Sequence, residues 1–343
     1  NPQHVEAMRL LADIGVRMGI YDDAEFLLES CVAFDPGNLR ARVDYTHLLL
    51  RKTKFRQAHE QARRLLDRNP ASPVFQSAMA ASCIGLGDFE AGLDWYRQVL
   101  ERFPDNHEAW VSVGHALKTM GRLNEAVDAY RKAYTLKPDH GDAYWSLANT
   151  KTYRFTDAEI AHIRVAEADP ATATDDRVHL CFAAGKALED RGEYDESFLY
   201  YERGNALKKR ALRYGPEENE RRVERQIAVC TQELFERHAD AGCKAHDPIF
   251  IVGLPRAGST LLEQILASHS MVEGTMELHN ILMLAQRLRG RTAAADPRYP
   301  AILHELEPEY FRRFGEQYLA DTRVYRQGAP RFIDKMPNNF LHV

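Results

Sequence analysis

The chain has 343 residues, enough for about two or three domains that each bury an apolar core. Its 45 basic and 50 acidic residues give a formal net charge of −5 and are mixed along the sequence, which argues against a broad nucleic-acid-binding surface. The five cysteines are scattered without a C-x-x-C pair, as expected for reduced thiols in a cytoplasmic protein. No apolar run approaches the roughly 20 residues of a membrane-spanning helix.

The first 140 residues carry a repeat of 34 residues. Its proline column is Pro36, Pro70, Pro104 and Pro138. A turn-forming residue stands 17 positions before each proline: Gly19, Thr53, Gly87 and Gly121. A small residue stands 12 positions before each proline: Ala24, Ala58, Gly92 and Ala126. Each unit therefore predicts two antiparallel helices that turn at the first column, pack closely at the second and end at the proline.

This pattern resembles the tetratricopeptide repeat. The match is fullest in residues 106–140, where the signature positions are Trp110, Gly114, Ala126, Tyr130 and Pro138. We therefore expect four such helix pairs in residues 1–140, and the resemblance implies that a protein or peptide binds their concave face.

The repeat becomes irregular after residue 140. Residues 141–170 begin like a fifth unit but reach Pro170 two residues early, and a unit resumes around Gly185 and Gly192. A long charged helix is expected at about 215–240, where it would end the array. Residues 141–246 are thus predicted to hold divergent repeat-like helices and a bridging helix.

From residue 247 the pattern becomes that of an α/β domain. PIFIVG at 248–253 is a short apolar run typical of a buried parallel strand, and RFID at 331–334 predicts a second strand. Helices are expected at about 259–269, 276–289 and 306–321. The chain starts without a signal peptide or initiator methionine and stops within an apolar pattern. We therefore expect a piece of a longer chain, with the α/β domain at 247–343 incomplete.

The turn after the first strand, GLPRAGST at 253–260, predicts an anion-binding loop. Glycines permit close approach, and the amides and dipole of the following helix attract an oxyanion. Thr260 adds a hydroxyl donor and Arg256 adds a positive charge. Ser259 stands where a nucleotide-binding P-loop has its lysine, and no Mg²⁺-holding set is evident, which favours a shorter anion than a triphosphate.

The stretch GLPRAGSTLLEQILASH is similar to the 5′-phosphosulfate-binding loop of sulfotransferases that use 3′-phosphoadenosine 5′-phosphosulfate (PAPS) as co-substrate. It is most similar to the tyrosylprotein sulfotransferase-like branch, whose bacterial members often follow tetratricopeptide repeats. The resemblance implies a P-loop-like α/β fold, no metal, and a set of cofactor-binding residues: Arg256, Ala257, Gly258, Ser259, Thr260 and Leu261.

The resemblance also places the catalytic groups. Arg256 and Lys335, in the context DKMP, would balance charge on the departing phosphate, and Glu277 would act as the base. Met276 precedes Glu277 where the family usually has Gly or Glu, and Glu273 is its rival. Glu277 could instead be a first-turn acid of the helix at 276–289, and Lys335 a surface lysine. His238, Cys243 and His246 form a loose set that we do not interpret as a metal site.

Three functions compete at this stage. The first is a sulfotransferase whose repeats bind the acceptor or a partner protein. The second is a protein-interaction scaffold with an inactive or incomplete P-loop-like domain. The third is an unusual P-loop kinase or NTPase, which Ser259 disfavours. The family's 3′-phosphate-binding residues would follow Val343, so we expect the chain as given to be inactive. The acceptor, whether tyrosine, carbohydrate or small molecule, and the oligomeric state are open.

Overall fold

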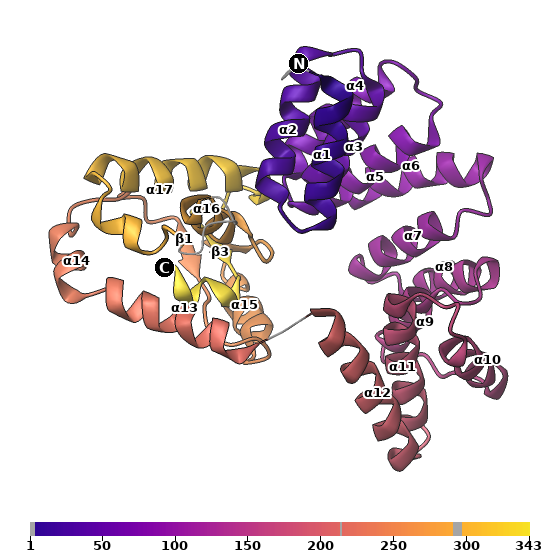
Figure 1. Ribbon diagram of the computed structural model, residues 1–343. Coiled ribbons are helices and arrows are strands. Elements are labelled where there is room, and N and C mark those ends of the chain that lie inside the picture. The colour runs from indigo at the N-terminus through magenta and orange to yellow at the C-terminus, as the bar shows by residue number, and fades with distance from the viewer. Residues whose placement is uncertain (1–3, 213–214, 291–296) are drawn as a thin grey trace. The chain divides into compact units, whose positions relative to one another are not determined.

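The computed structural model describes residues 4–212, 215–290 and 297–343 (Figure 1). Its contacts divide the chain into two compact units. The first comprises Asn1–Asp13 and Glu25–Tyr214, and the second comprises Ile14–Ala24 and Gly215–Val343. The domain bounds expected from the sequence, at 1–140, 141–246 and 247–343, stay a prediction.

The first eight helices form the four expected pairs. Their bounds are α1 Val5–Arg17, α2 Tyr21–Phe34, α3 Leu39–Arg51, α4 Phe55–Leu66, α5 Pro73–Gly85, α6 Phe89–Arg102, α7 His107–Thr119 and α8 Leu123–Leu136. Successive helices from α3 to α8 contact one another, as a solenoid requires.

The repeat columns have the predicted roles. Every residue of the turn column has a positive φ, between 56° at Thr53 and 86° at Gly87. In the small-residue column the alanines are fully buried, and a Cβ added at Gly92 would lie 2.5 Å from a side-chain carbon of Ile84. Close helix packing therefore explains why only small residues occur in that column.

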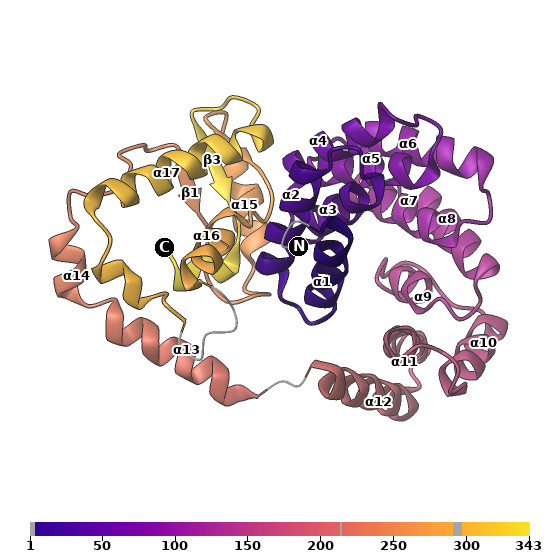
Figure 2. The same cartoon turned by 45° about the horizontal axis from the view of Figure 1, so that its top comes forward.

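The irregular part of the array remains helical. Its helices are α9 Gly141–Ala148, α10 Asp157–Ala168, α11 Thr174–Glu189 and α12 Tyr194–Leu212. The period slips because α9 has only 8 residues and is followed by a loop that buries Tyr153 and Phe155 in the core. Helices α11 and α12 lie side by side (Figure 1 and Figure 2), and one hydrophobic cluster continues from Leu93 to Tyr200.

The second unit contains a small parallel sheet. Its strands are β1 Pro248–Phe250, β2 Val272–Gly274 and β3 Arg331–Asp334, in the order β1-β3-β2. Ile249 pairs with Ile333, and Glu273 pairs with Phe332, so β3 is the central strand. The sequence predicted β1 and β3. It did not predict β2, which has only three residues.

Helices and 3₁₀ segments accompany this sheet: α13 Pro216–Val229, α14 Gln232–Arg237, α15 Ser259–Ala267, α16 Asn280–Arg289, η1 Ala301–His304, α17 Pro308–Thr322, η2 Arg323–Tyr325 and η3 Pro337–Leu341. The single helix predicted at 215–240 is wrong, since α13 ends at Val229 and Thr231 caps α14 through its side chain. In the described part of the chain, we find no helix with both the length and the apolar character needed to cross a membrane.

Candidate active site

The loops that follow the three strands meet at one edge of the sheet. Because the strands are parallel, their carboxyl ends share this edge, where ligands of α/β sheets commonly bind. A pocket of about 390 Å³ lies there. Its lining comes from all three loops: Pro255, Arg256, Gly258, Ser259, Thr260, Glu277, Met336, Pro337 and Asn338.

The loop after β1 is fixed by main-chain contacts to the neighbouring loop. The amide of Ile251 donates to the carbonyl of Asp334 at 3.0 Å, and that of Gly253 donates to the carbonyl of Pro337 at 3.1 Å. Gly258 has φ 87°, and Arg256 has φ 68°, a left-handed conformation that is uncommon for a residue with a side chain. Strain of this kind is often retained at ligand-binding sites.

The donors at the start of α15 are available to a ligand. Among the residues that the structure describes, no protein acceptor takes a hydrogen bond from the amides of Gly258, Ser259, Thr260 or Leu261. Within the same residues Arg256 forms no ion pair, and it lines the pocket. Free amides at a helix N-terminus beside a guanidinium fit an anionic ligand such as the 5′-phosphosulfate group.

Glu277 and Lys335 come together across the sheet edge. Lys335 Nζ donates to Glu277 Oε1 at 2.7 Å, and the lysine side chain is 11% exposed whereas the glutamate side chain is 55% exposed. The surface-lysine interpretation is therefore wrong. The first-turn-acid interpretation is also wrong, because α16 begins at Asn280 and Glu277 lies in the preceding loop. Their catalytic roles stay a prediction.

Comparison with known families decides the identity of each part. Residues 248–343 match the family described as "Sulfotransferase family". These residues are a sulfotransferase-family domain. Residues 16–82 and 107–140 match the tetratricopeptide repeat, so the predicted combination of the two is confirmed.

Individual relatives cover only parts of this arrangement. An uncharacterized protein of Aquifex aeolicus (strain VF5) is 30% identical over 253 residues, which are 73% of this chain and 33% of that protein. The chain thus spans about a third of that relative's length. "Small glutamine-rich tetratricopeptide repeat-containing protein 2" of Mycosarcoma maydis is 34% identical over 86 residues, 25% of this chain and 24% of that one.

Several solved structures resemble part of this chain. A thermophilic TPR protein of Thermus thermophilus has a TM-score of 0.45 at 19% identity, and it covers 52% of this chain and 98% of that one. The crystal structure of MamA has a TM-score of 0.35 at 16% identity, with coverage of 59% and 97%.

Within the sulfotransferase-family domain, the rival acid Glu273 is occupied by the main chain. Its Oε2 accepts hydrogen bonds from the amides of Gln327 at 2.8 Å and Ala329 at 3.3 Å. These bonds attach β2 to the chain segment that leads into β3. Glu273 thus has a structural task, and Glu277 lines the pocket.

Two buried acids near the site were not predicted. Burial raises the pKa of Asp334, the last residue of β3, to about 6, and its carboxylate accepts a hydrogen bond from the Tyr318 hydroxyl at 2.8 Å. Burial also raises the pKa of Glu263 on α15, while the positive charge of Lys335 acts in the opposite direction. A signal for Glu263 was present in the sequence, since a charged residue interrupts the apolar run LLEQIL.

Two of the residues that could have suggested a metal site, His238 and Cys243, are used in packing. The ring of His238 lies 4.6 Å from that of Phe311, and Cys243 packs against Gly315. Across residues 4–212, 215–290 and 297–343, no three His, Cys, Asp or Glu side chains are grouped so that they could hold a metal ion.

Proposed function

We propose that this protein is an enzyme that moves a sulfuryl group from PAPS to an acceptor hydroxyl. One observation carries the proposal: a lysine-free anion loop with available first-turn amides opens onto the same pocket as Glu277, the partner of Lys335. Such a loop suits a single 5′-phosphate that bears its transferable group, whereas a P-loop lysine serves β- and γ-phosphates. The match to the sulfotransferase family supports the same reaction.

The loop's task in this proposal is to bind and orient the donor. The amides of residues 258–261 and the hydroxyls of Ser259 and Thr260 hold the phosphosulfate oxygens, and the dipole of α15 adds to the attraction. Arg256 contributes a permanent positive charge and a planar set of donors. The bound donor supplies a sulfuryl group attached to a phosphate leaving group.

Glu277 acts as the base in this proposal. It takes the acceptor's hydroxyl proton while the oxygen–sulfur bond forms and the bond from sulfur to the 5′-phosphate oxygen breaks. A phenol has a pKa of about 10 and a glutamate about 4.3, a difference worth about 8 kcal/mol against deprotonation before attack. Proton transfer therefore accompanies bond formation. Lys335, hydrogen-bonded to Glu277, offsets the negative charge that grows on the departing phosphate.

The repeats contribute recognition in this proposal. Arrays of helix pairs present extended surfaces on which peptides or proteins bind, so the array is assigned the acceptor or a partner protein. The family matches to residues 16–82 and 107–140 support a protein-interaction role of this general kind.

Donor binding tests the proposal directly. Isothermal titration of a full-length version should show that adenosine 3′,5′-bisphosphate binds in preference to ATP with Mg²⁺. Arg256→Ala should weaken that binding about 10- to 100-fold, because a hydrogen bond from a charged group contributes about 1.5–3 kcal/mol. Arg287→Ala is the matched control, since it removes an exposed arginine of α16 that does not line the loop pocket. Tighter binding of ATP with Mg²⁺ would overturn the assignment.

Activity measurements distinguish the proposed enzyme from a protein-interaction scaffold. In a full-length version of the protein, Glu277→Gln should abolish sulfuryl transfer while adenosine 3′,5′-bisphosphate still binds. A protein-interaction scaffold would instead keep every activity when Arg256 and Glu277 are both replaced, and only changes in the repeats would matter.

A further inference from the structure

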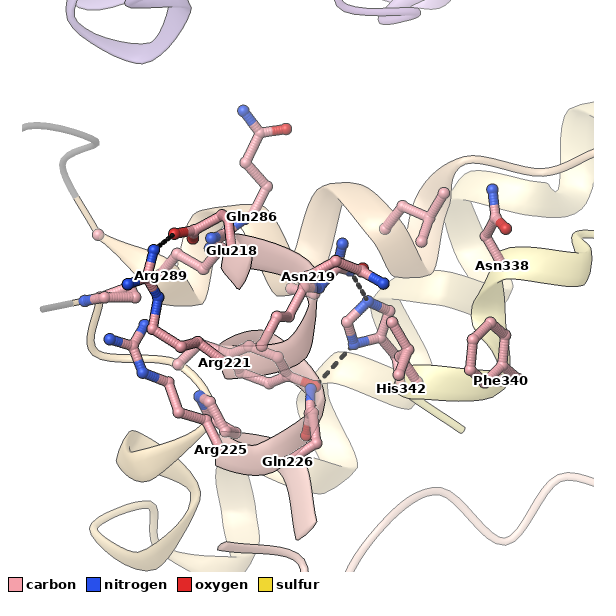
Figure 3. A pocket seen from close by; sticks show the side chains of 18 of the residues that line it. Glu218, Asn219, Arg221, Arg225, Gln226, Gln286, Arg289, Asn338, Phe340 and His342 are labelled. Atoms are coloured by element: carbon pink, nitrogen blue, oxygen red, sulfur yellow. Dashed lines mark hydrogen bonds and ion pairs between the residues drawn. The ribbon is translucent and has the colours of Figure 1, made fainter. Parts of the chain in front are cut away.

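A second, larger pocket, in the compact unit that contains Gly215–Val343, is rich in arginine (Figure 3). It has a volume of about 990 Å³ and lies among α13, α16 and the segment around η3. We call it the arginine pocket after four lining residues: Arg221, Arg222, Arg225 and Arg289. Two lining carboxylates, those of Asp22 and Glu218, leave positive charge in excess.

Among the residues that the structure describes, two of these arginines have no carboxylate partner. Arg221 pairs with Glu218 at 3.1 Å on its own helix. For Arg222 and Arg289, by contrast, the described part of the chain offers no ion pair, and both guanidinium groups line the pocket. Positive charge that the protein does not itself neutralise is a common feature of sites for carboxylate, sulfate or phosphate groups.

His342 adds neutral polar groups to the wall of the pocket. Burial and the charges of Arg222 and Arg289 lower the pKa of His342 to about 4, so its ring is neutral at pH 7. Arg222 Nη2 lies 3.3 Å from His342 Nε2, and because arginine can only donate, Nε2 is the acceptor and Nδ1 carries the proton. Nδ1 then donates to the Tyr299 hydroxyl at 2.8 Å. This chain of hydrogen bonds holds Arg222 in place without cancelling its charge.

The arginine pocket lies next to the loop pocket. Asn338 lines both, and the 3₁₀ segment η3 runs from Pro337 to Leu341. A 3₁₀ helix rises about 2 Å per residue, so Asn338 and His342 are separated by roughly 8 Å. Because Asn338 lines both, a molecule that extends past this residue would reach both pockets.

We infer that the arginine pocket binds an oxyanion group of the acceptor, so that the acceptor is a hydroxyl compound that also carries a carboxylate, sulfate or phosphate. The inference rests on the proposed sulfotransferase function, because it assigns the acceptor's hydroxyl to Glu277. The loop takes the donor, and the arginine pocket selects among acceptors by charge. A neutral alcohol of the same shape gains nothing from the unpaired guanidinium groups.

A pair of matched probes tests this inference. 4-Hydroxyphenylacetate carries a hydroxyl and a carboxylate, and 4-hydroxyphenylethanol is its neutral counterpart. We expect the first to bind the chain at least tenfold more tightly than the second. Arg289→Gln and Arg222→Gln should each remove about tenfold of this preference. Arg287→Gln, two residues from Arg289 on the same helix and outside the pocket lining, should leave the preference unchanged.

Two arginine variants are used because one of them could lose binding through a disturbed pocket wall. Arg222 contacts His342, and its replacement can disturb the wall, but Arg289 is exposed and has no such contact among the described residues. The ring signals of His342 in the nuclear magnetic resonance spectrum give a local readout, and they should shift when 4-hydroxyphenylacetate is added. Equal affinity for both phenols, or no shift at His342, would overturn the inference.

Binding of adenosine 3′,5′-bisphosphate shows whether the arginine pocket serves the acceptor or the donor. The affinity for adenosine 3′,5′-bisphosphate should be unchanged in Arg222→Gln and Arg289→Gln, and it should fall in Arg256→Ala. If the two pocket variants weaken the bisphosphate and leave 4-hydroxyphenylacetate unaffected, the pocket serves the donor's 3′-phosphate and the inference is wrong. If Arg256→Ala leaves the bisphosphate unaffected, the proposed function fails, whatever the phenols show.

Discussion

Replacing either member of the Glu277–Lys335 pair should have unequal effects on stability. Glu277→Gln leaves an ammonium group that is 11% exposed without its partner at 2.7 Å, whereas Lys335→Met leaves a carboxylate that is 55% exposed. Breaking a fully buried pair costs about 3–5 kcal/mol. Half of this pair faces water, so we reduce the cost of Glu277→Gln to about 1–2 kcal/mol. Lys335→Met should cost no more than about 0.5 kcal/mol.

Hydrogen exchange of the β3 amides measures this difference in the compact unit that contains the pair. A loss of about 1–2 kcal/mol lowers amide protection about 5- to 30-fold, and we expect that loss at Phe332 and Ile333 in Glu277→Gln. The chain has 3 tryptophans, at positions 95, 110 and 145, all in the repeats. Their fluorescence therefore reports the unfolding of the repeats, and the urea midpoint that it gives should be the same in the variants as in the wild type. Equal or greater loss of protection in Lys335→Met would show that the lysine is not the buried partner.

Three further predictions follow from local features. Burial raises the pKa of Asp334 to about 6 from the ordinary 3.9, so the folded domain binds the proton more tightly and Asp334 makes stability fall as pH rises from about 4 to 6. The pKa of His342 is lowered to about 4 from the ordinary 6.5, so His342 makes stability rise with pH over the same window and opposes Asp334. Asp334→Asn leaves the His342 effect alone and should steepen the loss of stability on acidification. A denaturation series from pH 7 to 4 measures this loss. Arg256→Gly should raise the free energy of unfolding by about 1 kcal/mol, because φ 68° suits glycine, and yet weaken the binding of adenosine 3′,5′-bisphosphate in a titration. Ser259→Lys restores the lysine of a P-loop and should shift the ratio of affinities toward ATP over adenosine 3′,5′-bisphosphate; an unchanged ratio would mean that the residue at this position does not set ligand choice.

Those parts of the fold that depend on contiguous residues were predictable. The turn at Gly87 needs a positive φ and the approach of helices at Gly92 excludes a side chain, and both requirements act within one repeat. They leave a sequence column at a fixed period, and this column is enough to predict the helix pairs from the sequence alone. The loop at 253–260 is contiguous in the same way.

Other features depend on distant partners and were missed or misplaced. Strand β2 is only Val272–Gly274, too short to produce an alternating pattern, and it exists because β3, almost 60 positions later in the sequence, pairs with it. The burial of Lys335 has the same origin, since β3 lies between the other two strands. No local property of DKMP distinguishes this lysine from an exposed one, and its assignment came from a family resemblance.

The strand order also explains how a loop without a lysine can belong to a charged site. In a P-loop the cation stands in the loop itself, beside the phosphates. Here Ser259 takes that place, and the buried cation follows the central strand, with the loop after β1 on one side and Glu277 after β2 on the other. In the proposed reaction, a lysine that directly follows β3 can therefore serve both the leaving phosphate and the base. Arg256, which has a left-handed conformation, has only the donor to contact in the proposed reaction.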